Sequence, residues 1–386
     1  MKKTDMPTLL LAPLLCAQTL LASRVVWRLL RSAGGARITA EEARHASGEQ
    51  VSVIVPVLNE RQRLAPCLQG LIAQGPEVAE IVVVDGGSDD GTQQLVSLYT
   101  QRDSRVRLVE TGPIPANWNG KAWGLQVGLR SASSCWILTI DADVRPAPLL
   151  ARSLLGRAKC AGLVALSIAT LQEIDTVAEA LLHPSLLTTL VYRFGIPGKS
   201  YAQVNAVQAN GQCFLFRREP LEACGGFQAA YNSICEDVTM ARTLVARGYP
   251  VGFYEAGELV SVKMYVGWRD AWRNWSRSLP MRDHFSGLNT LLGWLEVLLV
   301  QALPLPLLLV LWLLRKRQNW FFRLNGVLLA VRLGVLCGTA RAYRRRPWSY
   351  WLSPLCDLPV ALQLGKSALQ RRHVWRGRIL VRGGSQ

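Results

Sequence analysis

Short apolar runs alternate with amphipathic helical patterns in the first half of the chain. Runs of four to seven apolar residues, rich in Val and Ile, predict β-strands, and the polar–apolar spacing between them predicts helices. The predicted strands are 51–57, 81–84, 106–109 and 136–140, and the predicted helices are 60–74 and 92–102. Apolar strands that alternate with helices are typical of a sheet covered on both faces. We therefore expect an α/β fold.

Longer apolar segments lie at both ends of the chain. Residues 6–23 carry no charge and are followed by Arg24, Arg28 and Arg31, which favours a membrane anchor over a cleaved signal peptide. Near the C-terminus, residues 285–314 contain only Glu296 as a charged residue. This segment predicts a membrane span, and residues 320–340 predict a second one.

Two further segments admit more than one interpretation. Residues 348–365 contain Asp357 and three prolines at or near the segment, so either a span or a re-entrant or interfacial segment fits them. Residues 174–194 are almost entirely apolar, which suits a core helix or a membrane-facing gate for a lipid. Residues 366–382 predict a basic helix on an anionic membrane surface.

These patterns predict a multi-pass membrane protein with one soluble domain. We expect a membrane anchor over 1–31, a linker over 32–50, a catalytic domain over 51–283, a transmembrane region over 284–365 and a basic amphipathic tail over 366–386.

The charge of the chain agrees with membrane flanks better than with a nucleic-acid surface. The formal net charge is +17, and residues 315–386 hold 15 Lys and Arg but only one acid. These basic residues lie between apolar runs, whereas a nucleic-acid-binding surface interleaves them with polar and aromatic groups. The nine cysteines form no CxxC pair, so neither a disulfide framework nor a zinc site is expected.

Carboxylates follow the predicted strands at three places. Asp85 ends one strand, Asp141 and Asp143 follow another, and the pair Glu236–Asp237 follows a loop of small residues. Acids next to apolar strands are costly to bury without a cation or a donor. An Asp-x-Asp pair can hold Mg²⁺ or Mn²⁺ together with phosphate oxygens. The alternative for each acid alone is a turn or a helix N-cap.

The combination of these motifs resembles the family 2 glycosyltransferases of the GT-A fold. The resemblance covers residues 50–280 and includes Val53-Ile54-Val55-Pro56-Val57-Leu58-Asn59-Glu60. It implies transfer of a sugar from a nucleotide sugar, with inversion at the anomeric carbon and one carboxylate base. By position it implies that Pro56, Asn59, Glu60 and Asp85 line the nucleoside, that Asp141 binds the nucleotide and Asp143 the metal, and that Asp237 is the base, with Glu236 as its rival.

Lys121 is a further candidate for binding the nucleotide sugar. It lies at the start of a predicted helix, where its charge and the helix dipole can both neutralise a diphosphate; a surface lysine is the alternative. Its Trp-x-Gly-Lys segment resembles membrane glycosyltransferases that act on carotenoids, hopanoids and ceramide. Leu58 replaces an aromatic residue found in many relatives, so the resemblance does not specify uridine.

The membrane segments point to a lipid acceptor. We assign to the acceptor side Gln212, in a loop that fits those relatives, and Trp272, Arg273, Trp275 and Arg277 of a Trp- and Arg-rich segment. The overall pattern is most similar to cyanobacterial carotenoid 2-O-glycosyltransferases, with a ceramide or hopanoid glucosyltransferase as the alternative. An inactive nucleotide-binding scaffold is the alternative from another class. We expect the catalytic domain to face the cytoplasm.

Overall fold

The computed structural model describes residues 6–46, 48–233, 235–265, 267–278, 287–316, 319–370, 372–375 and 378–381, with the backbone alone for 6–11, 274, 276–278 and 372–381. The chain divides into two compact units. The sheet unit comprises Gly35–Glu173, Pro197–Met264 and Arg371–Gln386, and the helical unit comprises Met1–Gly34, Ile174–Ile196 and Tyr265–Gln370. The sequence predicts one continuous domain over 51–283, but residues 174–196 and those after 264 cluster with the helical unit instead.

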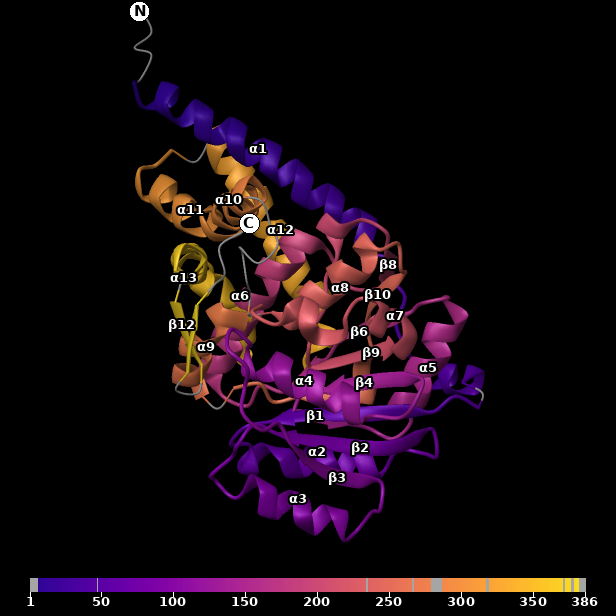
Figure 1. Ribbon diagram of the computed structural model, residues 1–386. Helices are drawn as coiled ribbons and strands as arrows, with labels where there is room; N and C mark the ends of the chain where they lie inside the picture. Colours follow the sequence, from indigo (N-terminus) through magenta and orange to yellow (C-terminus); the bar gives the residue numbers. More distant parts are fainter. Residues whose placement is uncertain are drawn as a thin grey trace, which may run out of the picture. The chain divides into compact units, whose positions relative to one another are not determined.

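An eight-stranded mixed sheet, in the order β3-β2-β1-β4-β9-β6-β10-β8, forms the centre of the sheet unit (Figure 1). The first four strands in this order are parallel, and β9 is antiparallel to both β4 and β6. The predicted α/β class is thus confirmed. The strands are β1 (Val51–Val57), β2 (Val78–Asp85), β3 (Val106–Glu110), β4 (Trp136–Ile140), β6 (Ala165–Ala169), β8 (Lys199–Tyr201), β9 (Cys213–Arg217) and β10 (Val251–Glu255).

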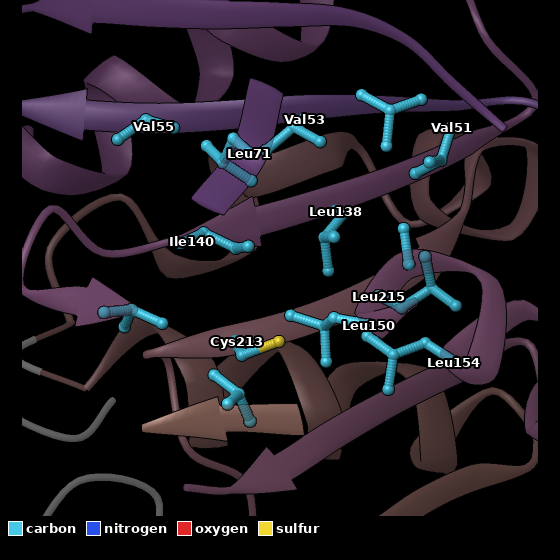
Figure 2. Packing of buried hydrophobic residues seen from close by; sticks show 14 of the residues in the cluster. Val51, Val53, Val55, Leu71, Leu138, Ile140, Leu150, Leu154, Cys213 and Leu215 are labelled. Atoms are coloured by element: carbon cyan, nitrogen blue, oxygen red, sulfur yellow. The ribbon is translucent and has the colours of Figure 1, made fainter. Parts of the chain in front are cut away.

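Helices cover both faces of this sheet because its strands are apolar on both sides. Val51, Val53 and Val55 pack on one face with Leu71 and with residues of α5, as Figure 2 shows, whereas Ile54 faces the opposite helix layer. The first layer contains α2 (Arg61–Ile72), α3 (Thr92–Thr100) and α5 (Leu150–Cys160), and the second contains α4 (Gly120–Ser131) and α8 (Glu236–Ala246). This alternation decides which strand residues pack against which helix layer.

Smaller elements complete the sheet unit. A second sheet has the order β5-β11-β7. The segment predicted as a linker includes a short 3₁₀ helix whose Ala43 is buried. These elements are β5 (Val144–Pro146), β7 (Leu171–Gln172), β11 (Val260–Val262), α7 (Arg218–Ala223), and the 3₁₀ helices η1 (Ala40–His45), η2 (Val204–Ala206), η3 (Gly226–Ala230) and η4 (Gly257–Leu259).

The helical unit is built from the apolar segments of both ends and from one helix of the middle. Its elements are α1 (Met6–Ser32), α6 (Val177–Phe194), α9 (Gly267–Ser278), α10 (Gly287–Glu296), the π-helical η5 (Val297–Ala302), α11 (Pro304–Leu313), α12 (Trp320–Thr339), and then η6 (Ala340–Ala342), η7 (Trp348–Cys356) and α13 (Asp357–Leu369).

The helical unit buries several polar and charged side chains in addition to its apolar clusters. Gln18, Glu296, Asn325, Arg332 and Asp357 are all buried there. Their charges are paired: Glu296 binds Arg24 and Arg28, and Arg332 binds Asp357. In the described part of the chain, all but four of the exposed large apolar side chains belong to this unit. Exposed apolar side chains together with paired buried charges are compatible with helices that contact lipid.

The spans predicted from sequence are only partly matched. Among the described residues, one helix, Trp320–Ala342, is long and apolar enough to cross a membrane, and Gly287–Ala302 with Pro304–Leu313, bent by 44°, is a second candidate if it counts as one span. The anchor predicted over 6–23 begins outside the residues whose side chains are described, so it stays a prediction. Residues 348–365 form η7 and α13 and not a span, because 13 residues of helix extend only about 20 Å.

The C-terminal tail differs from its prediction. Among the described residues of 366–382, the helix does not continue past Leu369, where α13 ends, and β12 (Arg372–Trp375) pairs antiparallel with β13 (Arg378–Val381). The β-branched and aromatic residues in both short segments favour strands over a helix, which is the physical reason for the difference.

Candidate active site

The loops after β1 and β2 are joined by hydrogen bonds at the carboxyl edge of the sheet. Asn59 has a left-handed backbone, and its Oδ1 accepts from the Asp89 amide at 3.0 Å. Its own amide donates to Ser88 Oγ at 2.9 Å, and the Glu60 amide donates to Thr92 Oγ1 at 2.9 Å. Because parallel strands of such sheets bind ligands at this edge, these loops form one wall of the candidate site.

Asp85 orders the second of these loops. It is buried, and its carboxylate accepts from the Gly87 and Ser88 amides, from Ser88 Oγ and, at 2.7 Å, from Gln93 Nε2. These contacts match the turn interpretation of a single aspartate. The role of Asp85 and of Pro56 in lining a nucleoside stays a prediction.

Asp141 and Asp143 occupy the tight turn between β4 and β5. The Asp141 amide donates to the Gln212 carbonyl at 3.1 Å, which ties this turn to the start of β9. Asp143 Oδ1 is buried and has no hydrogen-bond partner. Burial, followed by the charges of Asp141 and Glu60, raises the pKa of Asp143 to about 7. Such an oxygen can accept a cation at little further desolvation cost.

Lys121 connects two of the predicted acidic motifs. Helix α4 begins after Asn119, whose Oδ1 accepts from the Lys121 amide at 3.0 Å. From this first turn, Lys121 Nζ lies 2.7 Å from Asp141 Oδ1 and 2.7 Å from Glu236 Oε1. Burial alone would lower the pKa of Lys121, but the two carboxylates outweigh it and raise the pKa well above its usual value. The ammonium therefore stays charged.

Glu236 and Asp237 begin α8 but have different surroundings. Glu236 is buried against Lys121, whereas Asp237 is only partly buried. Asp237 Oδ2 accepts from the Gly211 amide at 2.6 Å, and Oδ1 accepts from the Val238 amide at 2.8 Å. Burial, followed by the charge of Glu236, raises the pKa of Asp237 to about 7. The two backbone amides thus fix the position of the Asp237 carboxylate, and its raised pKa suits it to accept a proton near neutral pH.

Gly211 and Gln212 form the loop that faces these acids. A Cβ on Gly211 would lie 3.1 Å from Glu236 Oε1 and 3.3 Å from Lys121 Nζ, so only glycine fits without displacement. Gln212 is buried, and its Oε1 accepts from Thr170 Oγ1 at 2.6 Å and from Asn210 Nδ2 at 3.0 Å. The loop is therefore rigidly positioned beside Asp237.

A divalent cation is compatible with this donor set. No three His, Cys, Asp or Glu side chains converge as a metal site within the described residues. A cation held by Asp143, beside Asp141, would take its other ligands from phosphate oxygens and water, which is the usual mode for Mg²⁺ with nucleotides. The unpartnered, buried Asp143 Oδ1 is the observation that fits this role.

The residues predicted for the acceptor side belong to two different units of the chain. Gln212 belongs to the sheet unit, whereas Trp272, Arg273 and Trp275 belong to α9 of the helical unit. Trp275 is buried in a cluster with α6 and α13, whereas Arg273 is exposed. The assignment of these residues to the acceptor side stays a prediction. The side chain of Arg277 lies outside the described residues.

Two positions with a clear structural role are not among the sequence-based site residues. Asn119 caps α4 and also donates from Nδ2 to the Ser233 carbonyl at 2.9 Å, which connects Lys121 to the loop before α8. Gly211 provides both space and an amide for Asp237. An Asn before Gly-Lys is a recognisable N-cap signal, but the close approach of Gly211 has no sequence signature.

The chain is similar in sequence to known glycosyltransferases. Residues 52–225 match the family model "Glycosyl transferase family 2". The lipopolysaccharide core biosynthesis glycosyltransferase LpsC of Rhizobium meliloti is 36% identical over 95 residues, 25% of this chain and 32% of that protein. The probable glycosyltransferase YdaM of Bacillus subtilis is 24% identical over 237 residues, 59% of this chain and 54% of that protein.

The chain thus spans about a third to a half of the length of these curated relatives. Among solved structures, the mannosyltransferase PcManGT of Pyrobaculum calidifontis in complex with GDP-Man and Mn²⁺ is 20% identical, with a TM-score of 0.49 over 91% of this chain and 97% of that one. The family match over residues 52–225 and the curated relatives agree with the predicted glycosyltransferase class.

Proposed function

We propose that the chain is an inverting glycosyltransferase that moves one sugar from a nucleotide sugar to a hydroxyl of a membrane lipid. One observation carries the proposal: Lys121 Nζ lies 2.7 Å from both Asp141 and Glu236, beside Asp237. A cationic group for a diphosphate and a candidate base are thus adjacent. Transfer to a hydroxyl needs both.

In the proposed reaction, Asp237 accepts the proton of the acceptor hydroxyl while the oxygen of that hydroxyl attacks the anomeric carbon. The bond from that carbon to the diphosphate breaks on the opposite face, so the configuration inverts. Lys121, at the N-terminus of α4, neutralises the charge on the departing nucleoside diphosphate. Mg²⁺ or Mn²⁺ held by Asp143 would stabilise the same charge when bound. Glu236 holds Lys121 in place.

A lipid acceptor is supported by the helical unit. Its exposed apolar side chains, including Leu309, Trp312, Trp320 and Val327, indicate a membrane environment. Among lipid hydroxyls, the sequence resemblance favours a carotenoid, with 2-O-glycosylation as the reaction. The ceramide or hopanoid class is the second candidate, and glycosyltransferases with lipid-linked names, such as the dolichyl-phosphate beta-glucosyltransferase ALG5C of Trichomonas vaginalis, are among the relatives.

Nucleotide release by the full chain in lipid nanodiscs tests the proposal. A panel of UDP and GDP sugars is supplied with and without a lipid extract, and the released nucleoside diphosphate is measured. We expect one donor to be consumed only when the extract is present, and chelation of divalent ions to stop turnover. Absence of release from every donor would instead favour the inactive scaffold. Deletion of the gene, followed by mass analysis of lipids and pigments, identifies the acceptor: we expect a carotenoid glycoside to disappear.

A further inference from the structure

The segment from Trp348 to Leu362 exposes five large apolar side chains and buries the polar side chains of Ser349, Ser353 and Asp357. Trp348, Trp351, Leu352, Leu355 and Leu362 are 44–68% exposed. Along η7 and the first half of α13, these exposed side chains alternate with the buried residues Ser349, Tyr350, Ser353, Pro354 and Asp357. We call these five residues the Trp–Leu stripe.

The opposite side of the same segment is polar and tied to its neighbours. Ser349 Oγ donates to the Val177 carbonyl of α6 at 2.8 Å. Asp357 binds the guanidinium of Arg332 at 2.8 Å, and Ser353 Oγ accepts from the same guanidinium at 3.2 Å. Because these buried groups are paired, they hold the stripe in its outward orientation.

The stripe is too short to be a membrane span. Helix α13 has 13 residues, about 20 Å, against the roughly 30 Å of a bilayer core. η7 contains Pro354 and is a 3₁₀ helix, and neither element meets the criteria for a span. An apolar face of this length, ending in tryptophans, suits the interface between headgroups and acyl chains.

Charge next to the stripe indicates which surface it meets. Arg344, Arg345 and Arg346 directly precede it and are exposed, and no acidic residue lies between Arg341 and Cys356. Tryptophan beside clustered arginine matches a membrane surface with anionic headgroups, where each arginine contributes about a five-fold gain in association.

We propose that the Trp–Leu stripe and the adjacent arginines dock the helical unit in the interfacial layer of an anionic bilayer leaflet. The stripe lies in the interface and does not cross the membrane. This inference does not depend on the chemistry of the sheet unit, so it holds or fails independently of the proposed glycosyl transfer.

Spin labelling of the full chain in vesicles tests this docking. The label is placed at Leu355→Cys in a variant in which Cys16, Cys135, Cys160, Cys337 and Cys356 are replaced by Ser, and Leu98→Cys on the exposed side of α3 serves as the reference. Oxygen reports exposure to lipid, and a water-soluble nickel complex reports exposure to water. In vesicles of phosphatidylcholine with phosphatidylglycerol, we expect the Leu355 label at headgroup depth and the Leu98 label in water.

A variant that lacks two arginine charges tests whether anionic headgroups contribute to docking, or whether only the apolar side chains of the Trp–Leu stripe do. Arg344→Gln with Arg345→Gln should lower the ratio of lipid-associated to water-exposed Leu355 label by about 25-fold, five-fold for each arginine. Arg102→Gln with Arg152→Gln removes the same charge from exposed positions of the sheet unit and should leave that ratio unchanged. A water-accessible label in every vesicle, a label at the bilayer centre, or dipolar broadening from a second copy would each overturn the proposal.

Discussion

Adjacent acids at the start of α8 have distinct roles because their side chains meet different partners. Glu236 is paired with Lys121, whereas Asp237 is held by two backbone amides. We predict that Asp237→Asn lowers turnover by about 10² to 10⁴-fold, since it removes the base and keeps the side chain's size. Donor binding, measured by titration with the nucleoside diphosphate, should be nearly unchanged.

Glu236→Gln is the matched control for this prediction. It leaves Asp237 intact and weakens only one of the two ion pairs of Lys121, so we expect a smaller loss of turnover and weaker donor binding. Wild-type turnover in Asp237→Asn together with an inactive Glu236→Gln would exchange the assignments. Full activity in both variants would exclude a base on this loop.

The raised pKa of Asp237 predicts a specific pH profile. With a pKa of about 7, the side chain is protonated below pH 7 and cannot accept the acceptor's proton. Turnover at saturating donor and constant metal should fall about tenfold per pH unit below 7 and level off above it. The same shift lowers the free energy of unfolding as the pH rises from about 4 to 7, because the folded state binds the proton more tightly. A rate that stays flat down to pH 5 would contradict the assignment.

Gly211 sets the space available to three charged groups. Gly211→Ala would put a methyl 3.1 Å from Glu236 Oε1 and 3.3 Å from Asp237 Cβ. We predict a loss of turnover of about tenfold or more, since misplacement by fractions of an ångström is costly in a reacting geometry. Gly338→Ala adds the same methyl where nothing lies within 4 Å and should leave the rate unchanged. Equal rates for the two variants would show that the site tolerates the methyl.

The sequence identifies the acids of the site better than their connections. Asp141, Asp143, Glu236 and Asp237 are recognisable because each follows an apolar strand or a small-residue loop. Their link through Lys121 is not recognisable, since it depends on how α4 is placed against residues 20 and 115 positions away along the chain. The full set of donors on Asp85 is likewise visible only in three dimensions.

At the scale of elements, Asn119 couples the start of α4 to the loop before α8. Asn119→Ala removes the N-cap of Lys121's helix and the bond to the Ser233 carbonyl. We predict a loss of about 1–2 kcal/mol in the free energy of unfolding, together with weaker donor binding because Lys121 loses its fixed position. Asn119→Asp keeps the cap acceptor and should restore most of the stability. Thermal unfolding and donor titration measure the two effects, and stability lost without any change in donor binding would confine Asn119 to a capping role.

Strands that are buried on both faces were the most predictable elements. β1 and β4 have their predicted bounds because continuous apolar runs leave few other conformations for them. The segment after residue 347 was less predictable. A helix that is apolar on one side only and a helix that is apolar all round can have similar amino-acid compositions. The polar inward residues Ser349, Ser353 and Asp357 distinguish the two only once their partners are known.

At the scale of the whole molecule, two native cysteines report on which side of the membrane the sheet unit lies. Cys135 and Cys160 are exposed and belong to this unit. Because nucleotide sugars are cytoplasmic, we predict that a membrane-impermeant maleimide leaves both thiols unlabelled in intact cells and labels them after permeabilisation. Cys135→Ser with Cys160→Ser should abolish that labelling. Labelling in intact cells would place the sheet unit outside and would contradict a cytoplasmic donor.

The chain crosses between the two units five times, which limits how one unit could be transferred to another protein by gene fusion. The family-matched segment 52–225 contains α6, whose residues Leu182, Leu186 and Tyr192 are buried in clusters of the helical unit. A gene fusion that moved residues 35–264 into another protein would carry this helix away from its packing partners and leave an apolar surface behind. We therefore expect the sheet unit and the helical unit to be exchanged between proteins only together.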